Sequence, residues 1–144
     1  MQTYIVVADA SRARLFTRDG ERLVEQEDLQ HPEGRLHEGD LVTDRGADVH
    51  ESTATTARST HETAKAKKHE TEMFARRVAD LLYQKRVENR LETLILVAPP
   101  HFLGLLRGKL DNSTNRLVSH TLSKDFAHSR AEEIGAAVAQ LGRR

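Results

Sequence analysis

Two short runs of apolar residues stand out along the chain, at Tyr4–Ala8 and at Leu94–Ala98. Uninterrupted apolar runs of this length are typical of strands that are buried on both faces of a sheet. Asp9 ends the first run, and Pro99 and Pro100 end the second. The pattern therefore predicts two central strands, each followed by a turn.

Shorter apolar segments flank these two runs. Residues Ala13–Thr17 and Leu23–Leu29 are separated by the turn sequence around Asp19-Gly20, which favours a tight hairpin because Asp and Gly readily adopt a positive φ. Together with the first run they predict a three-stranded antiparallel meander. A fifth strand is predicted at Leu117–Leu122.

Helical periodicity is clearest after residue 63. We expect a long helix from about Ala64 to Asn89, a short helix at His101–Leu110 and a terminal helix at Ser129–Leu141. The long helix has an apolar stripe at helical spacing, made of Met73, Phe74, Val78, Leu81 and Leu82. The opposite face of this helix is charged.

Residues 31–63 show almost no apolar periodicity. Four helix- and strand-breaking residues interrupt the first half of this segment, namely Pro32, Gly34, Gly39 and Gly46. Long loops inside compact domains are uncommon and are often functional or mobile. We therefore expect one extended, partly ordered loop at about 31–63.

The order of the predicted elements, three strands and then helix, strand, helix, strand, helix, indicates an α/β fold. A helix between two strands predicts a parallel, right-handed crossover, which makes the two most apolar strands neighbours. The simplest arrangement is a five-stranded mixed sheet in the order 3-2-1-4-5 with helices on both faces. That is the topology of ribonuclease H-like domains. The length suits a single domain over residues 1–144.

The charges balance overall but not locally. Lys and Arg number 22, as do Asp and Glu, so net charge gives no general attraction to nucleic acid or membrane. Residues 19–51 hold eleven acidic residues against three basic ones, and residues 58–90 hold nine basic against five acidic. Either the molecule is electrically two-sided, or the two blocks neutralise each other in the fold.

The sequence has no Cys, which excludes disulfides, thiolate metal sites and a Cys nucleophile. No segment approaches the ~20 apolar residues that a transmembrane helix needs. The first nine residues lack the basic region and the long apolar run of a signal peptide. We expect a cytoplasmic protein that does not insert into membranes.

Basic residues gather where the long loop meets the long helix. Six of the basic residues of the chain are candidates for RNA or phosphate contacts: Arg12, Arg58, Lys65, Lys67, Lys68 and Arg107. Glu62, Glu70 and Glu72 lie among the lysines. Few aromatic residues accompany these charges, so the segment offers few rings on which RNA bases could stack. The alternative interpretation is an ordinary solvated helix face with Lys-Glu pairs.

A second candidate site lies where the two central strands end. Open α/β sheets usually bind ligands in the crevice at the carboxyl ends of their strands. Asp9, Ser11 and His101 are placed to line such a pocket. Alternatively, Asp9 bonds nearby backbone N–H groups in a turn, and the two prolines only set the angle between strand and helix.

No catalytic motif accompanies these residues. The sequence contains no Gly-x-Ser-x-Gly elbow, no P-loop and no Gly-x-Gly-x-x-Gly. A two-metal nuclease site needs several converging carboxylates, and Ala98-Pro99-Pro100 supplies none beside Asp9. The eight histidines lack metal-ligand spacing. We expect no metal, cofactor or enzymatic activity; a hydrolase or nuclease that uses Asp9 and loop acids is the remaining catalytic alternative.

Four segments carry a family resemblance, in the same order along the chain. They are residues 6–16 (VVADASRARLF), 31–36 (HPEGRL), 96–107 (LVAPPHFLGLLR) and 124–128 (KDFAH). These segments resemble motifs of the bacterial host-attachment protein family. That family takes its name from a proposed role in the attachment of bacteria to host cells, and its fold is related to the central domain of archaeal and eukaryotic peptide-chain release factors and of Pelota.

The resemblance implies two different kinds of biology, a role in host attachment and an association with the ribosome, RNA or another protein. Release factors use a Gly-Gly-Gln tripeptide in the loop ahead of the long helix. Residues 31–63 contain no Gln and no adjacent glycines. We therefore expect a binding protein and not a peptidyl-tRNA hydrolase.

Overall fold

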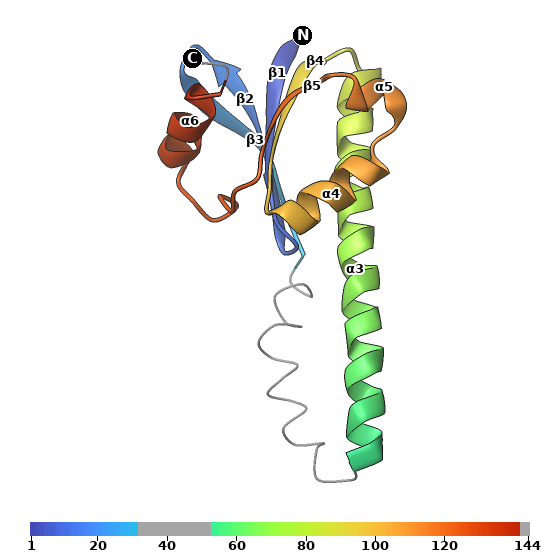
Figure 1. The fold of residues 1–144 in the computed structure, drawn as a ribbon. Helices are drawn as coiled ribbons and strands as arrows, with labels where there is room; N and C mark the ends of the chain where they lie inside the picture. Colours follow the sequence, from blue (N-terminus) through green and yellow to red (C-terminus); the bar gives the residue numbers. More distant parts are fainter. Residues whose placement is uncertain (32–52, 142–144) are drawn as a thin grey trace.

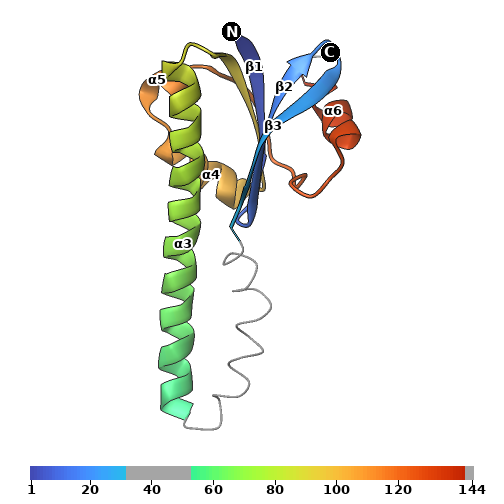
Figure 2. The ribbon, with the colours of Figure 1, turned by 180° about the vertical axis from the view of Figure 1, so that it is seen from behind.

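The computed structural model describes residues 1–31 and 53–141, with side chains described from residue 62 onward in the second stretch. The described part contains one sheet with helices on both of its faces (Figures 1 and 2). The sheet has five strands in the order β3-β2-β1-β4-β5. The strands are β1 (Gln2–Ala8), β2 (Arg12–Asp19), β3 (Arg22–Gln30), β4 (Leu91–Val97) and β5 (Val118–Leu122).

This order confirms the predicted α/β sheet. The two apolar runs lie side by side and parallel as β1 and β4, with Ile5 opposite Ile95 and Val7 opposite Val97. The first three strands form the predicted antiparallel meander, and β5 runs parallel to β4. The topology is compatible with a ribonuclease H-like fold.

The helices divide between the two faces of the sheet. On one face lie α3 (Thr53–Val87), α4 (Pro100–Lys109) and the short α5 (Asn112–Asn115), while α6 (Ala131–Ala139) covers the other (Figures 1 and 2). Alternate residues of each central strand enter opposite cores. Val6 and Leu96 pack under α3 and α4, whereas Val7 and Val97 pack under α6. This alternation explains why both central strands are apolar throughout.

The long helix begins earlier than the sequence pattern predicted. It starts at Thr53 and not near Ala64, so the last part of the expected 31–63 loop is helical. Residues 53–63 have no apolar stripe, which is why hydrophobic periodicity did not reveal them, but they also contain no Gly or Pro to stop a helix. The rest of the expected loop, residues 32–52, lies outside the described residues.

The first half of α3 extends beyond the sheet (Figures 1 and 2). From residue 62 onward, the first buried side chain of α3 is Thr71, and the apolar residues Phe74, Val78 and Leu82 follow on the sheet-facing side. At 1.5 Å per residue, the 35 residues of α3 span about 52 Å. Although α3 is long, no described helix is apolar enough to cross a membrane.

Candidate functional site

The β1–β2 turn at the carboxyl end of β1 is built around Asp9. Its Oδ1 accepts hydrogen bonds from the backbone N–H of Ser11 at 2.8 Å, from Ser11 Oγ at 3.0 Å and from the backbone N–H of Arg12 at 2.9 Å. This is the geometry of an Asx turn, in which a short carboxylate replaces a backbone acceptor. Asp9 and Ser11, predicted as pocket residues, therefore contact each other.

The segment before α6 packs against this turn. Nε2 of His128 lies 3.2 Å from Asp9 Oδ2. The buried Arg14 donates from Nη1 to the carbonyl oxygens of Ala127 and Ser129, and from Nε to Glu25 at 2.7 Å. The segments at 6–16 and 124–128, which carried two of the family motifs, thus meet in space.

His128 is the residue of this cluster that sequence reasoning did not single out. The available signal was its place in the closing motif, because nothing in its spacing from Asp9 indicates contact. The third predicted pocket residue, His101, is exposed in the first turn of α4. It makes no hydrogen bond or ion pair with a described residue, so it does not bond to Asp9, whereas His128 does.

The order of contacts in this cluster limits its chemistry. A nucleophilic triad places the histidine between the hydroxyl and the carboxylate, so that the imidazole can take the hydroxyl proton. Here Asp9 lies between Ser11 and His128, and its Oδ1 already accepts three hydrogen bonds. Within the described residues, no three His, Asp or Glu side chains come together as metal ligands do. The geometry fits a structural junction.

Two of the predicted phosphate-binding arginines are engaged elsewhere. Arg12 holds Asp28 in a bidentate pair, with Nε to Oδ1 at 3.0 Å and Nη2 to Oδ2 at 2.7 Å. This hydrogen bonding lowers the pKa of Asp28 and raises the pKa of Arg12. Arg107 donates from Nε and Nη2 to Oδ1 of Asn115, at 3.2 and 2.9 Å. The charge of Arg12 is thereby balanced, whereas that of Arg107 is not.

The predicted lysines lie on the part of α3 that extends beyond the sheet. Lys65 and Lys68 are exposed, Lys67 is half-buried, and Arg58 belongs to α3 although its side chain lies outside the described set. Lys65 and Lys68 share one helical face with Arg76 further along. None of these three cations has a hydrogen bond or ion pair in the described part of the chain.

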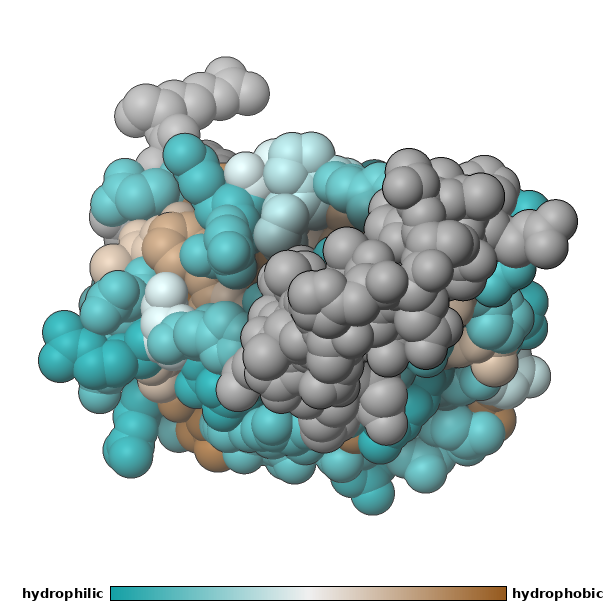
Figure 3. Space-filling model, turned by 90° about the horizontal axis from the view of Figure 1, so that it is seen from below, coloured by the Kyte–Doolittle hydropathy of each residue, from teal (hydrophilic) through white to brown (hydrophobic). Residues whose placement is uncertain are grey.

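We call Lys65, Lys68 and Arg76 the basic stripe of α3. Glu72 lies on the same face and is half-buried, and Glu62 and Asp80 lie about one turn beyond its two ends. None of these three carboxylates forms an ion pair with a cation of the stripe in the described part of the chain. Figure 3 shows the molecule from below, and the coloured part of that face is mostly hydrophilic with smaller hydrophobic areas.

A cavity of about 400 Å³ adjoins the upper end of the basic stripe. It is lined by His31, Met73, Phe74, Arg76, Arg77 and Asp80. The His31 and Phe74 rings are stacked, with centroids 5.1 Å apart and planes 12° apart. Sequence reasoning missed this site because His31 and Phe74 are distant in the chain and meet only where β3 ends against α3.

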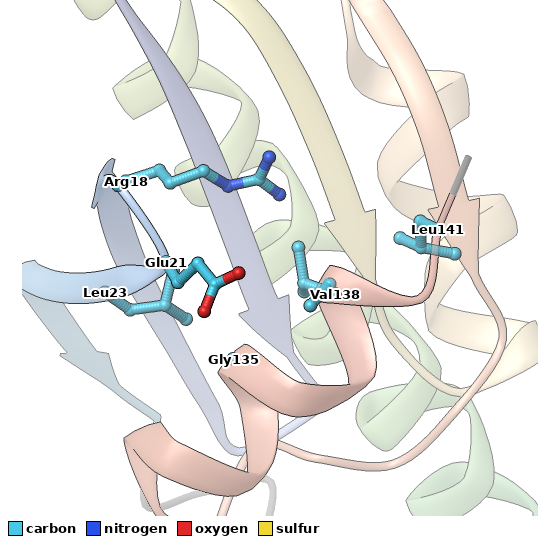
Figure 4. Close-up of a pocket in the computed structure, with 8 residues that line it drawn as sticks. Arg18, Glu21, Leu23, Gly135, Val138 and Leu141 are labelled. Carbon is cyan, nitrogen blue, oxygen red and sulfur yellow. The ribbon is translucent and has the colours of Figure 1, made fainter. Parts of the chain in front are cut away.

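A second cavity, of about 280 Å³, lies between the β2–β3 hairpin and α6 (Figure 4). Arg18 and Glu21 supply polar groups to its lining, and Leu23, Val138 and Leu141 supply apolar walls. Gly20 forms the tight turn with φ of +65°, as the hairpin signal predicted. Gly135 of α6 faces the hairpin, where an added Cβ would meet Leu23 Cγ at 3.7 Å.

The sheet order and the two-sided helical cover define a small α/β domain with a mixed five-stranded sheet. A family model described as "Protein required for attachment to host cells" matches residues 4–138, and the chain belongs to this family. No curated protein matched the sequence significantly.

Three solved structures are similar to this chain, each with a TM-score of 0.49. They are an archaeal protein at 13% identity, the archaeal translation termination factor aRF1 at 14%, and Dom34 of S. cerevisiae, a translation termination-like factor, at 13%. The matches cover 98%, 96% and 96% of this chain. They cover only 34%, 36% and 35% of those chains, so this chain spans about a third of their length.

Proposed function

We propose that this member of the host-attachment family is a non-catalytic binding protein that contacts RNA through the extended half of α3. The observation that carries the proposal is the basic stripe. Lys65, Lys68 and Arg76 are exposed on one face of a helix that reaches beyond the sheet, and none is neutralised by a described residue. Uncompensated cations at helical spacing are suited to phosphate contacts.

The position of the stripe supports binding to a large partner. Because the first half of α3 projects away from the sheet, α4, α5 and α6 leave its basic face open to a partner surface. The family resemblance of the sequence makes ribosomal RNA the first RNA to test. The proposed location is then the cytoplasm, with residues 1–144 acting as a single domain.

A binding role also agrees with the junction at Asp9. Its Oδ1 is saturated by turn donors, and its Oδ2 faces His128. A residue used in this way holds the β1–β2 turn to the segment before α6. We therefore assign Asp9 and Ser11 to positioning this end of the sheet, and leave His101 without an assigned role.

Co-sedimentation with ribosomes tests the proposal. We expect the protein in ribosomal fractions of a sucrose gradient at low salt, and we expect the double variant Lys65→Glu/Lys68→Glu to be lost from them. The matched control is Arg116→Glu/Lys124→Glu, which makes the same charge change at two exposed positions away from the stripe. Absence of the wild-type protein from these fractions, together with no binding to purified RNA, would refute the proposal.

A role in host attachment is the second candidate, and the description of the family supports it. Such a role requires the protein, or something that it controls, to act at the cell surface. Surface labelling of intact cells distinguishes the two cases. Labelled protein on intact cells would favour direct attachment, whereas labelling only after lysis would leave the RNA-binding proposal in place.

A further inference from the structure

We propose that the cavity beside His31 receives an unpaired guanine base of the bound RNA, while the basic stripe holds the neighbouring phosphates. This inference rests on the proposed RNA-binding function. It adds a base-binding subsite to a surface that would otherwise recognise only the backbone.

The size and composition of the cavity fit a single ring system. Its volume of about 400 Å³ lies within the ~300–1,000 Å³ that is typical of small-molecule pockets. Pockets of this kind combine apolar walls with a few polar groups that orient the ligand. Here Met73 and the His31–Phe74 pair provide the apolar part, and Arg76, Arg77 and Asp80 provide the polar groups.

The aromatic wall is held in place before any ligand binds. Phe74 is only 2% exposed, so it offers almost no surface to a base itself and instead supports the His31 ring; it also packs against Phe102, with ring centroids 6.0 Å apart. His31 is fixed by its stacking on Phe74 and by a 2.8 Å hydrogen bond from its backbone N–H to the carbonyl oxygen of Ser11. A preformed wall reduces the entropic cost of binding a flat ring.

Two further side chains present surfaces that suit a base. Met73 is 51% exposed, and its thioether and methylene groups are well matched to an aromatic face. Arg77 is oriented by donating from Nη1 to the carbonyl oxygen of Gln30 at 3.3 Å. Unpaired bases are commonly stacked on aromatic rings and on guanidinium planes in proteins that bind RNA.

Asp80 makes the site selective. Its carboxylate is exposed and has no hydrogen bond or ion pair with a described residue. A carboxylate only accepts hydrogen bonds, and the Watson–Crick edge of guanine presents two adjacent donors, N1–H and the N2 amino group. Adenine presents a single donor group beside an acceptor on that edge. Guanine is therefore the base that Asp80 can bind through both oxygens.

Arg76 connects the cavity to the basic stripe. It lines the cavity and also shares a helical face with Lys68, eight residues and about 12 Å earlier along the axis. An RNA strand that follows Lys65 and Lys68 thus reaches Arg76 at the edge of the cavity. The next base is then positioned to enter it.

Fluorescence anisotropy with uridine-rich RNA hexamers tests this inference. Each hexamer carries one central guanosine, inosine or adenosine. Inosine keeps the N1–H of guanine but lacks the N2 amino group. We expect the guanosine hexamer to bind about tenfold more tightly than the adenosine hexamer, with inosine between them. The Asp80→Asn variant should lose this preference and keep its affinity for an all-uridine hexamer. The control Asp125→Asn, at another exposed aspartate, should retain the preference.

The outcomes separate the two proposals. Equal affinity of the wild-type protein for all three hexamers, with binding that still weakens in salt, would refute the guanine site and leave the RNA-binding function standing. A guanine preference that survives Asp80→Asn would also refute the site. If no hexamer binds and ribosomes do not bind either, both proposals fail.

Discussion

The carboxylate of Asp9 lies 3.2 Å from Nε2 of His128, which joins the end of the first strand to the segment just before the last helix. The Asp9 side chain is 18% exposed and that of His128 is 47% exposed. The two residues therefore contribute differently. The largely buried Asp9 holds the β1–β2 turn together, whereas the half-exposed His128 contacts Asp9 from the solvent side.

Replacing Asp9 by Ala should lower the free energy of unfolding by about 1–3 kcal/mol, because three donors in the turn lose their acceptor. The midpoint of urea denaturation measures this loss. His128→Ala is the comparison, and we expect it to cost less than about 1 kcal/mol, since exposed pairs contribute little. Equal losses for the two variants would show that Asp9 acts through His128 and not through the turn.

The Asp111 cap of α5 should make part of the stability of the folded protein depend on pH. Thr114 donates to Asp111 from Oγ1 at 2.6 Å and from its backbone N–H at 3.2 Å, and Arg86 lies 3.3 Å from the same carboxylate. These hydrogen bonds, and the charge of Arg86, lower the pKa of Asp111 below its ordinary 3.8. Because the pKa of Asp111 is lower in the folded protein than in the unfolded chain, the ionised carboxylate stabilises the fold at any pH above the unfolded-state pKa. This contribution is lost as the pH falls through the folded-state pKa.

We therefore expect Asp111→Asn to be less stable than the wild type at neutral pH. The difference should shrink as the pH falls below about 4, where the wild-type carboxylate becomes protonated. Urea midpoints measured across this range test the prediction, with the exposed Asp125→Asn as the control. A difference that stays constant with pH would mean that the charge of Asp111 contributes nothing.

Gly135→Ala should stabilise α6. An added Cβ would meet Leu23 Cγ at 3.7 Å, which is an ordinary van der Waals contact, and Gly costs about 1 kcal/mol relative to Ala inside a helix. We expect an increase of about 0.5–1 kcal/mol, seen as a higher melting temperature. A lower melting temperature would show that α6 and the hairpin pack more closely than these distances indicate.

RNA binding through the basic stripe should depend strongly on salt. For single strands, each phosphate contact contributes about 0.7 to the slope of log affinity against log salt concentration. The Lys65→Ala/Lys68→Ala variant should therefore reduce this slope by about 1.4 for a uridine-rich RNA. Arg116→Ala/Lys124→Ala should leave the slope unchanged, and an equal reduction there would mean that binding is spread over the whole surface.

Some elements of this fold were predictable and others were not. The parallel pairing of β1 and β4 followed from two apolar runs and the helix between them. The start of α3 at Thr53 did not, because residues 53–63 contain no apolar residue larger than Ala and so have no hydrophobic period to detect. The four-residue α5 was also missed, since its stability depends on the Asp111 cap and on the contact of Thr114 with Arg86.

The candidate sites divide in the same way. The sequence named Lys65 and Lys68, but it could not show that Arg12 is neutralised by Asp28 or that Arg76 has no ion-pair partner in the described chain. It placed Asp9 and Ser11 together and also expected His101, where the structure has His128.

The sequence by itself determined the sheet order, the helices that carry an apolar stripe and the family, because apolar periodicity and local motifs are properties of consecutive residues. Only the tertiary structure decided which charges remain unpaired and that His31 stacks on Phe74 beside Asp80. Such contacts join residues from β3 and α3, and their distances depend on how whole elements pack.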